Sequence, residues 1–132
     1  MDLGRREFIL MAGAAALTAA APGFALAKGE GKMYGLIGKM IAVSGQRDAL
    51  ISILLEGVSG MPGCLSYVVA KDPADANAIW ITEVWDGPAN HTASLQLPAV
   101  QAAIAKARPL IAGFSDRVET VPVGGVGLRE KP

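Results

Sequence analysis

A glutamate, a tryptophan and the chain's only histidine stand close together in residues 77–91, and no other segment combines such groups. Residues 78–85 alternate as in a β-strand, so side chains two positions apart share a face. Glu83 and Trp85 therefore project side by side. Asp86-Gly87-Pro88 then ends the strand and opens a helix, because proline suits the first helical position. His91 follows about one helical turn later.

These side chains could carry acid–base chemistry, because histidine titrates near neutral pH and a glutamate in apolar surroundings has a raised pKa. Each also has a purely structural interpretation. Trp85 could be an ordinary core residue, and His91 could lie on the helix surface or pair with Glu83. An inward-facing glutamate is costly unless it is paired, and Arg108 or Arg117 could supply that ion pair. The sequence leaves both interpretations open.

The composition narrows the range of functions. The 132-residue chain is long enough for one domain with a core, and its 12 basic and 12 acidic residues balance. No basic stripe alternates with aromatic residues, so we expect no nucleic-acid partner. Cys64 has no second cysteine to pair with, and its place at the start of a strand favours a small buried hydrophobe over a nucleophile. With one histidine and no cysteine cluster, we expect no metal site.

The first residues predict an export signal. Arg5-Arg6-Glu7-Phe8-Ile9-Leu10 is a twin-arginine signature, and an Ala-rich apolar run leads to an Ala25-Leu26-Ala27 cleavage pattern. The alternatives are an amphipathic first helix or a membrane anchor. The apolar run is shorter than the ~20 residues that span a bilayer, and Pro22-Gly23 interrupts it. We therefore expect residues 1–27 to be removed on export through the twin-arginine pathway. The product would be a periplasmic or secreted protein without a membrane segment.

The remaining chain is predicted to form one domain, residues 28–123, followed by a flexible tail, residues 124–132. The hydrophobic pattern predicts strands at about residues 33–43, 64–72, 78–85 and 114–123. It predicts helices over residues 46–58, from residue 88 onwards and over residues 99–107, with Leu97-Pro98 separating the last two. The polar residues 72–77 predict a hairpin. The order β-α-β-β-α-β is that of the ferredoxin-like α+β fold, an antiparallel four-stranded sheet with helices on one face.

The strands carry apolar residues on both faces, which is typical of a sheet covered on both sides. The predicted helices cover one face only, so the second cover should come from another copy of the chain across a two-fold axis. We expect Glu83 and Trp85 to face the helices and any pocket. We expect Trp80 and Val84 to face the partner. The sequence thus predicts a homodimer joined through the sheet.

Three motifs, in this order and spacing, resemble those of the antibiotic biosynthesis monooxygenase family of dimeric α/β barrels, which includes small quinol-monooxygenase-like members. They are Pro62-Gly63-Cys64 before the second strand, Glu83-Val84-Trp85-Asp86 at the end of the third, and His91 followed by Ser94 and Leu97. The resemblance extends from about Tyr34 to Val123. It implies a cofactor-independent oxygenase of electron-rich aromatic substrates, or a relative of the same fold with another role.

Under this resemblance the protein need only bind, deprotonate and shield a small quinol or phenol, because the deprotonated ring is a good one-electron donor to oxygen. Such a site needs an apolar pocket, an aromatic wall and a base. Trp85 could be the wall, and either His91 or Glu83 could be the base. Tyr67 and Tyr34 could orient the substrate's oxygens. The resemblance implies no cofactor and no metal.

Two rival functions share this fold. A non-catalytic dimeric domain could bind a small apolar ligand, or only pack, because fold does not fix function. One branch of the family degrades haem, and its iron-ligating histidine lies in the second helical run at a position that matches Ile104 here. Without that histidine a haem at this pocket would lack its axial ligand, so haem degradation ranks third.

Overall fold

The computed structural model describes residues 32–58 and 60–129. The predicted export signal, residues 1–27, lies outside the described residues, as do residues 130–132 of the predicted tail. The elements in chain order are β1 (Tyr34–Ala42), α3 (Arg47–Gly57), β2 (Cys64–Lys71), β3 (Ala78–Trp85), α4 (Pro88–Ser94), α5 (Pro98–Ala107), the short 3-10 helix η1 (Arg108–Leu110) and β4 (Ile111–Thr120). No helix in the described part of the chain is long and apolar enough to cross a membrane.

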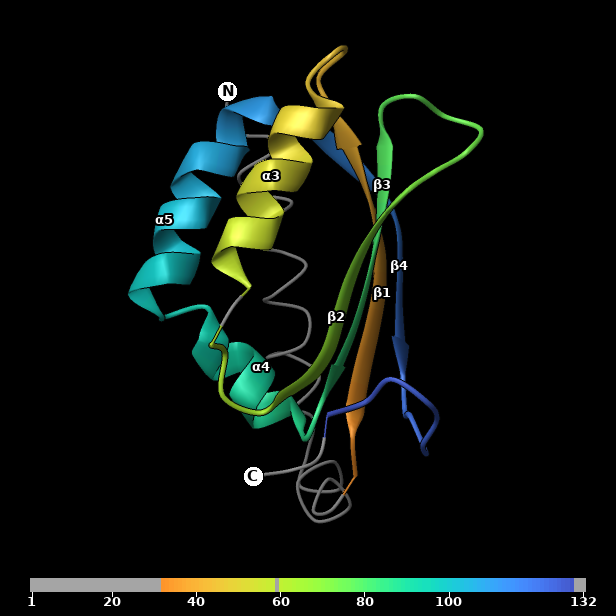
Figure 1. The fold of residues 1–132 in the computed structure, drawn as a ribbon, viewed down its shortest axis with the longest axis vertical. Helices are drawn as coiled ribbons and strands as arrows, with labels where there is room; N and C mark the ends of the chain where they lie inside the picture. Colours follow the sequence, from red (N-terminus) through yellow and green to blue (C-terminus); the bar gives the residue numbers. More distant parts are fainter. Residues whose placement is uncertain (1–31, 59, 130–132) are drawn as a thin grey trace.

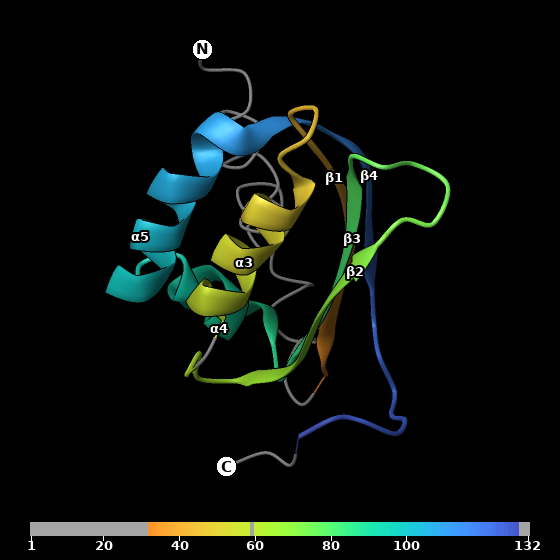
Figure 2. The same cartoon turned by 45° about the horizontal axis from the view of Figure 1, so that its top comes forward.

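The four strands form one antiparallel sheet in the order β2-β3-β1-β4. Figure 1 shows α3 and α5 side by side over one face of this sheet, while the other face carries no helix of the described residues. The short helix α4 lies beyond them, at the end of the sheet where β1 begins and β3 ends (Figure 2). The predicted hairpin joins β2 to β3. The ferredoxin-like α+β fold expected from the sequence is therefore confirmed.

Burial along β3 follows the alternation that the sequence predicts. The residues at positions 79, 81, 83 and 85 are buried, Thr82 is exposed, and Trp80 and Val84 are half-buried. Glu83 and Trp85 thus share the helix-covered face, and Trp80 and Val84 lie on the face without helices. The predicted division of β3 between two faces is confirmed.

The buried side chains on the helix-covered face form two clusters. The first lies between α3 and the sheet and includes Leu50, Leu54 and Ile79. The second includes Leu36 and Trp85 and lies towards α4. The second cluster therefore contains the aromatic residue of the predicted site.

Strand β4 differs from its prediction, because it begins at Ile111 instead of residue 114 and ends at Thr120 instead of residue 123. Helix α5 ends at Ala107, as the proline at position 109 requires. The next residues make a turn of 3-10 helix that leads directly into the strand, where Ile111 pairs with Ala42 and is buried. Pro122 lacks the N–H group that would continue the ladder. The other elements lie where the sequence places them.

Residues 121–129 form no helix or strand. The backbone N–H of Arg129 donates a hydrogen bond of 2.9 Å to the carbonyl of Leu65, so this segment returns to the start of β2. Val123 and Val126, which lie along it, are almost fully exposed.

Candidate active site

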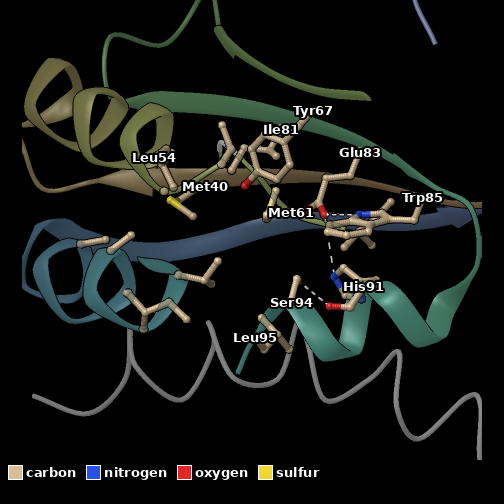
Figure 3. Close-up of a pocket in the computed structure, with 17 residues that line it drawn as sticks. Met40, Leu54, Met61, Tyr67, Ile81, Glu83, Trp85, His91, Ser94 and Leu95 are labelled. Carbon is tan, nitrogen blue, oxygen red and sulfur yellow. Dashed lines mark hydrogen bonds and ion pairs between the residues drawn. The ribbon is translucent and has the colours of Figure 1, made fainter. Parts of the chain in front are cut away.

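A cavity lies between the helix-covered face of the sheet and the helices, with about 750 Å³ of space between its atoms, part of it open to solvent. Pockets that are mostly apolar with a few polar groups are typical of small-molecule sites. The sheet and the helices both contribute apolar walls: Leu36, Met40, Ile81, Leu54 and Ile104. The three residues singled out from the sequence, Glu83, Trp85 and His91, gather at one end (Figure 3).

Glu83 is the acidic group of this polar end, and only 9% of its surface is exposed. Its Oε1 accepts a hydrogen bond of 2.9 Å from the indole N–H of Trp85, the neighbour that strand alternation predicts. Burial raises the pKa of Glu83 to about 7, because apolar surroundings disfavour the carboxylate. The Trp85 hydrogen bond and the charge of Arg117 oppose that rise. The carboxyl group can therefore both take up and release a proton near neutral pH.

His91 projects from α4 into the same end of the cavity and is buried. The centre of its ring lies 5.5 Å from that of Trp85, in an edge-to-face arrangement, and 5.2 Å from that of Tyr34. Its Nδ1 has no hydrogen-bond partner among the described residues. The imidazole is thus held by ring contacts instead of by a hydrogen-bonded orienting group.

The protonation of His91 follows from its burial. Burial and, to a smaller extent, the charge of Arg117 lower the pKa of His91 to about 4, and the charge of Glu119 opposes them. The ring is therefore uncharged at neutral pH. Its Nε2 lies 3.8 Å from Oε1 of Glu83, which is too long for a hydrogen bond. With a neutral imidazole this contact is not an ion pair.

The Pro62-Gly63-Cys64 turn fixes the start of α4. Gly63 has φ +82°, a conformation that suits glycine, and a Cβ at this position would collide with the side chain of Asn90. The carbonyl of Gly63 accepts a hydrogen bond of 2.9 Å from the backbone N–H of Asp86. The Asn90 amide donates one of 2.9 Å to the Asp86 carboxylate. Together these contacts set the direction in which His91 enters the cavity.

The two tyrosines predicted to orient a substrate lie in different places. Tyr67 lines the cavity, whereas Tyr34 is not among its lining residues. The hydroxyl of Tyr34 donates a hydrogen bond of 2.8 Å to Glu119, and the ring of Tyr34 packs against that of His91. Arg117 forms an ion pair of 3.4 Å with the same Glu119 carboxylate.

Neither arginine predicted as a possible partner of Glu83 supplies its hydrogen bond, which comes from Trp85. Arg117 acts on Glu83 through its charge, which lowers the pKa. The Nε of Arg108 is buried without a hydrogen-bond partner among the described residues.

Sequence reasoning missed Asn90 and Glu119. The role of Glu119 depends on register, because Leu36 pairs with Glu83 on one side and with Glu119 on the other. Alternation along β4 could indicate the face of Glu119 but not the residues beside it. The contact between Asn90 and Gly63 depends on how closely the turn before β2 approaches α4. In the sequence, the glycine at position 63 was the only signal of this approach.

Cys64 is half-buried and packs against the cluster that contains Trp85. Its Sγ donates to the carbonyl of Ser66 at 3.6 Å. Burial raises the pKa of the Cys64 thiol, and the charge of Glu83 adds to this. The thiol is therefore protonated at neutral pH, in keeping with the packing role that the sequence predicts.

The family model described as antibiotic biosynthesis monooxygenase matches residues 33–106, which include β1, β2, β3 and the whole of α4. The chain belongs to the antibiotic biosynthesis monooxygenase family. The matched range contains Glu83, Trp85, His91 and Tyr67, so the polar end of the cavity is part of the family domain.

Solved structures agree with this membership. A protein from Chloroflexus aurantiacus J-10-fl, assigned to the antibiotic biosynthesis monooxygenases, is 71% identical with a TM-score of 0.71, and the match covers 73% of this chain and 98% of that one. Proteins with the same assignment from Caulobacter crescentus CB15 and Nitrosomonas europaea are 17% and 14% identical, each with a TM-score of 0.60. They cover 69% and 73% of this chain and 88% and 92% of their own, and at this identity they show the fold alone. No curated protein matches the chain.

Position 104 matches the iron-ligating histidine of the haem-degrading branch of the family. Ile104 lies in the cavity wall and offers no ligand to a haem iron. The chain's only histidine is on α4, beside Glu83. The described residues contain no cluster of three or more His, Cys, Asp or Glu side chains that could hold a metal ion. The position that holds the iron ligand in the haem-degrading branch therefore has no ligand in this chain.

Proposed function

We propose that the protein is a cofactor-independent monooxygenase that acts on small quinol or phenolic aromatic substrates with molecular oxygen. The observation that carries the proposal is the buried Glu83, with a pKa of about 7, at the polar end of an apolar cavity. Such a carboxylate can take a phenolic proton, and the apolar walls can hold an aromatic ring away from water. Membership of the family supports monooxygenase chemistry. The mostly apolar walls, with polar groups at one end, support a small aromatic substrate that carries a hydroxyl group.

The proposed reaction begins with transfer of the substrate's hydroxyl proton to Glu83, which leaves an electron-rich phenolate. The phenolate passes one electron to O₂, and the resulting phenoxyl radical and superoxide combine by a C–O bond at a ring carbon that carries hydrogen. The peroxide takes the proton back from Glu83. Loss of the hydrogen from that carbon, with cleavage of the O–O bond, gives a quinone carbonyl and water. The substrate supplies all the electrons, so no outside reductant is needed.

Glu83, and not His91, is the base in this proposal. A histidine with a pKa of about 4 accepts a phenolic proton far less readily than a carboxylate with a pKa of about 7. The indole N–H of Trp85 holds Oε1 of Glu83 in place, and its ring forms an aromatic wall. The neutral His91 ring lines the same end of the cavity and packs against Trp85.

We also propose that the mature protein is a periplasmic or secreted homodimer. The twin-arginine motif at Arg5-Arg6 supports export. Exposed valines on the sheet face without helices, Val68 and Val118, support pairing with a second copy.

Oxygen uptake with a panel of hydroquinones, naphthoquinols and simple phenols tests the enzymatic proposal. We expect uptake with at least one of them, and one atom of labelled O₂ in each product. Glu83→Gln should abolish most of the rate, whereas Trp85→Phe and His91→Ala should lower it less. Circular dichroism would show that each variant is folded. No uptake across the panel, or uptake that Glu83→Gln leaves unchanged, would overturn the proposal.

The rival function is a non-catalytic domain that binds a small apolar ligand, and the mostly apolar cavity beside Trp85 supports it. Titration of tryptophan fluorescence with the same panel, with and without oxygen, separates the two functions. Binding without oxygen consumption would favour the rival.

A further inference from the structure

The hydroxyl of Tyr67 is a polar group in the cavity for which the described residues provide no hydrogen-bond partner. The ring packs against both core clusters, so it lies where the two meet. Burial raises the pKa of Tyr67, and the charge of Glu83 adds to the rise, so the hydroxyl keeps its proton and can donate. Buried donors in native proteins normally have an acceptor. Tyr67 is half-buried and its hydroxyl is not one of the fully buried atoms without a partner, so the hydroxyl opens onto the cavity, and a ligand that covers it would have to supply the acceptor.

Tyr67 and Glu83 face each other across the β2–β3 ladder and share the helix-covered face of the sheet. Their side chains extend in different directions. Figure 3 shows the carboxyl of Glu83 directed towards Trp85 and His91, and the hydroxyl of Tyr67 directed towards Met40. The cavity therefore has two polar points, with apolar walls along the rest of its length.

We infer that Tyr67 donates a hydrogen bond to a second oxygen of the substrate, at the end of the ring opposite the hydroxyl that Glu83 deprotonates. The site then selects aromatic compounds with an acceptor oxygen at each end, such as para-dihydroxy and para-alkoxy phenols, over phenols whose far end is hydrocarbon. This inference rests on the proposed use of the cavity as a substrate site. Tyr67 is a specificity-determining residue in this scheme, and Glu83 remains the base.

The selectivity follows from what happens to Tyr67 when a ligand fills the cavity. A ligand with only carbon at its far end would cover the hydroxyl and leave a buried donor unpaired, which is unfavourable. A ligand with an ether or hydroxyl oxygen at that end would pair it. The change in the affinity difference between two such ligands of equal size, when the hydroxyl of Tyr67 is removed, therefore reports the hydrogen bond.

The experiment compares para-methoxyphenol with para-ethylphenol, and the same pair built on a naphthol ring, by isothermal titration calorimetry without oxygen. The members of each pair are nearly equal in size, but only the methoxy compound has the second acceptor. We expect the wild-type protein to bind the methoxy member about fivefold more tightly, the size of one net hydrogen bond. Tyr67→Phe should lose this preference and should bind the ethyl member more tightly than the wild type does, because no donor is left unpaired.

Tyr34→Phe is the matched control, because it removes a phenolic hydroxyl outside the cavity and should keep the fivefold preference. The melting temperature of Tyr67→Phe should equal or exceed that of the wild type, since the hydroxyl has no partner among the described residues. A clear fall would instead indicate a structural role and count against the inference. A preference that Tyr67→Phe retains would overturn it, as would a wild-type protein that binds neither pair or both members equally.

The two proposals fail separately. Oxygen uptake without any preference for the methoxy compounds would overturn the role of Tyr67 and leave the monooxygenase proposal standing. A preference that depends on Tyr67, without oxygen uptake by any substrate, would support this inference and overturn the oxygenase function.

Discussion

Burial shifts the pKa values of Glu83 and His91 in opposite directions. It raises the pKa of Glu83 to about 7 and lowers that of His91 to about 4, because an apolar cavity favours the uncharged form of each. Between these values both side chains are neutral. Above about pH 7 the carboxylate forms while the imidazole stays neutral, so a base becomes available without a positive charge on the neighbouring histidine.

The pH dependence of the reaction should therefore follow Glu83. We expect kcat/KM for a quinol to rise with pH to a plateau, with a midpoint at about 7, because only the carboxylate accepts the proton. Glu83→Gln should lower the plateau about 100-fold and remove the midpoint. His91→Phe should keep it, since His91 titrates at about pH 4. An oxygen electrode measures both profiles, and a midpoint that persists in Glu83→Gln would assign the base elsewhere.

The same two groups should affect stability in opposite senses. Between pH 4.5 and 7 the folded protein holds a Glu83 proton that the unfolded chain has released, so this group's contribution to the free energy of unfolding falls as pH rises. Between pH 4 and 6.5 the unfolded chain binds a His91 proton that the folded protein lacks, so this contribution rises with pH. In the wild type the two partly cancel.

Urea unfolding over a pH series would separate the contributions of Glu83 and His91 to the free energy of unfolding. Relative to wild type, Glu83→Gln should gain roughly 3 kcal/mol of unfolding free energy between pH 4.5 and 7, because it loses the falling contribution. His91→Phe should lose a similar amount between pH 4 and 6.5. Curves that run parallel to the wild type in both variants would contradict the burial of these groups.

At the scale of elements, helices α3 and α5 approach closely where Gly57 faces Ala103. A Cβ built on Gly57 would lie 2.7 Å from that of Ala103, which is inside normal contact distance. Both residues also line the cavity, so the spacing of the two helices shapes its wall.

Gly57→Ala should lower the free energy of unfolding by about 1 kcal/mol, although alanine favours helices by about as much. The overlap with Ala103 is the reason, because a packed interface must shift to admit the new methyl group. Ala103→Gly should restore part of this loss in the double variant but destabilise the wild type. A double-mutant cycle by urea unfolding measures the coupling between the two sites, and strictly additive effects would show that the helices do not meet there.

Local signals were sufficient to locate the strands and helices other than the ends of β4, including the break at Leu97-Pro98, because each depends on residues that are close in sequence. The pairing of Glu83 with Trp85 followed from strand alternation in the same way. Contacts between distant segments were not predictable. Tyr34 was expected at the substrate but bonds to Glu119, since alternation gives the face of a strand and not its register with a neighbour.

At the scale of the whole molecule, the sheet face without helices carries a row of mostly apolar residues that crosses all four strands. The pairing registers place Val68, Thr82, Ile37 and Val118 side by side in that order. Val68 and Val118 are each 53% exposed. Within residues 32–58 and 60–129 helices cover only the opposite face, so this row is the part of the fold that a second copy would cover.

The proposed location can be tested independently of the fold. Replacing both Arg5 and Arg6 with lysine keeps the charge but removes the twin-arginine signature. We expect the variant to stay in the cytoplasm at full length, whereas the wild type should appear outside the inner membrane without residues 1–27. Cell fractionation with mass spectrometry of the N-terminus measures both. Export of the double variant at the wild-type level would exclude this pathway.

The proposed dimer makes a prediction that compares the two faces of the molecule at equal exposure. Val118→Glu and Val68→Glu place a charge in the apolar row, where a second copy would have to bury it, so each should raise the dimer dissociation constant at least about tenfold. Leu55, on α3 in the helix layer, is also 53% exposed, which makes Leu55→Glu the matched control. It should leave the dimer intact.

Light scattering across a range of concentrations measures the three variants and the wild type. A wild-type mass equal to the monomer would exclude the dimer. Dissociation by Leu55→Glu but not by the sheet variants would move the interface to the helix layer. Because the cavity lies on the helix-covered face, the sheet variants should still bind substrate, and loss of binding on dissociation would mean that the second copy helps to hold the site together.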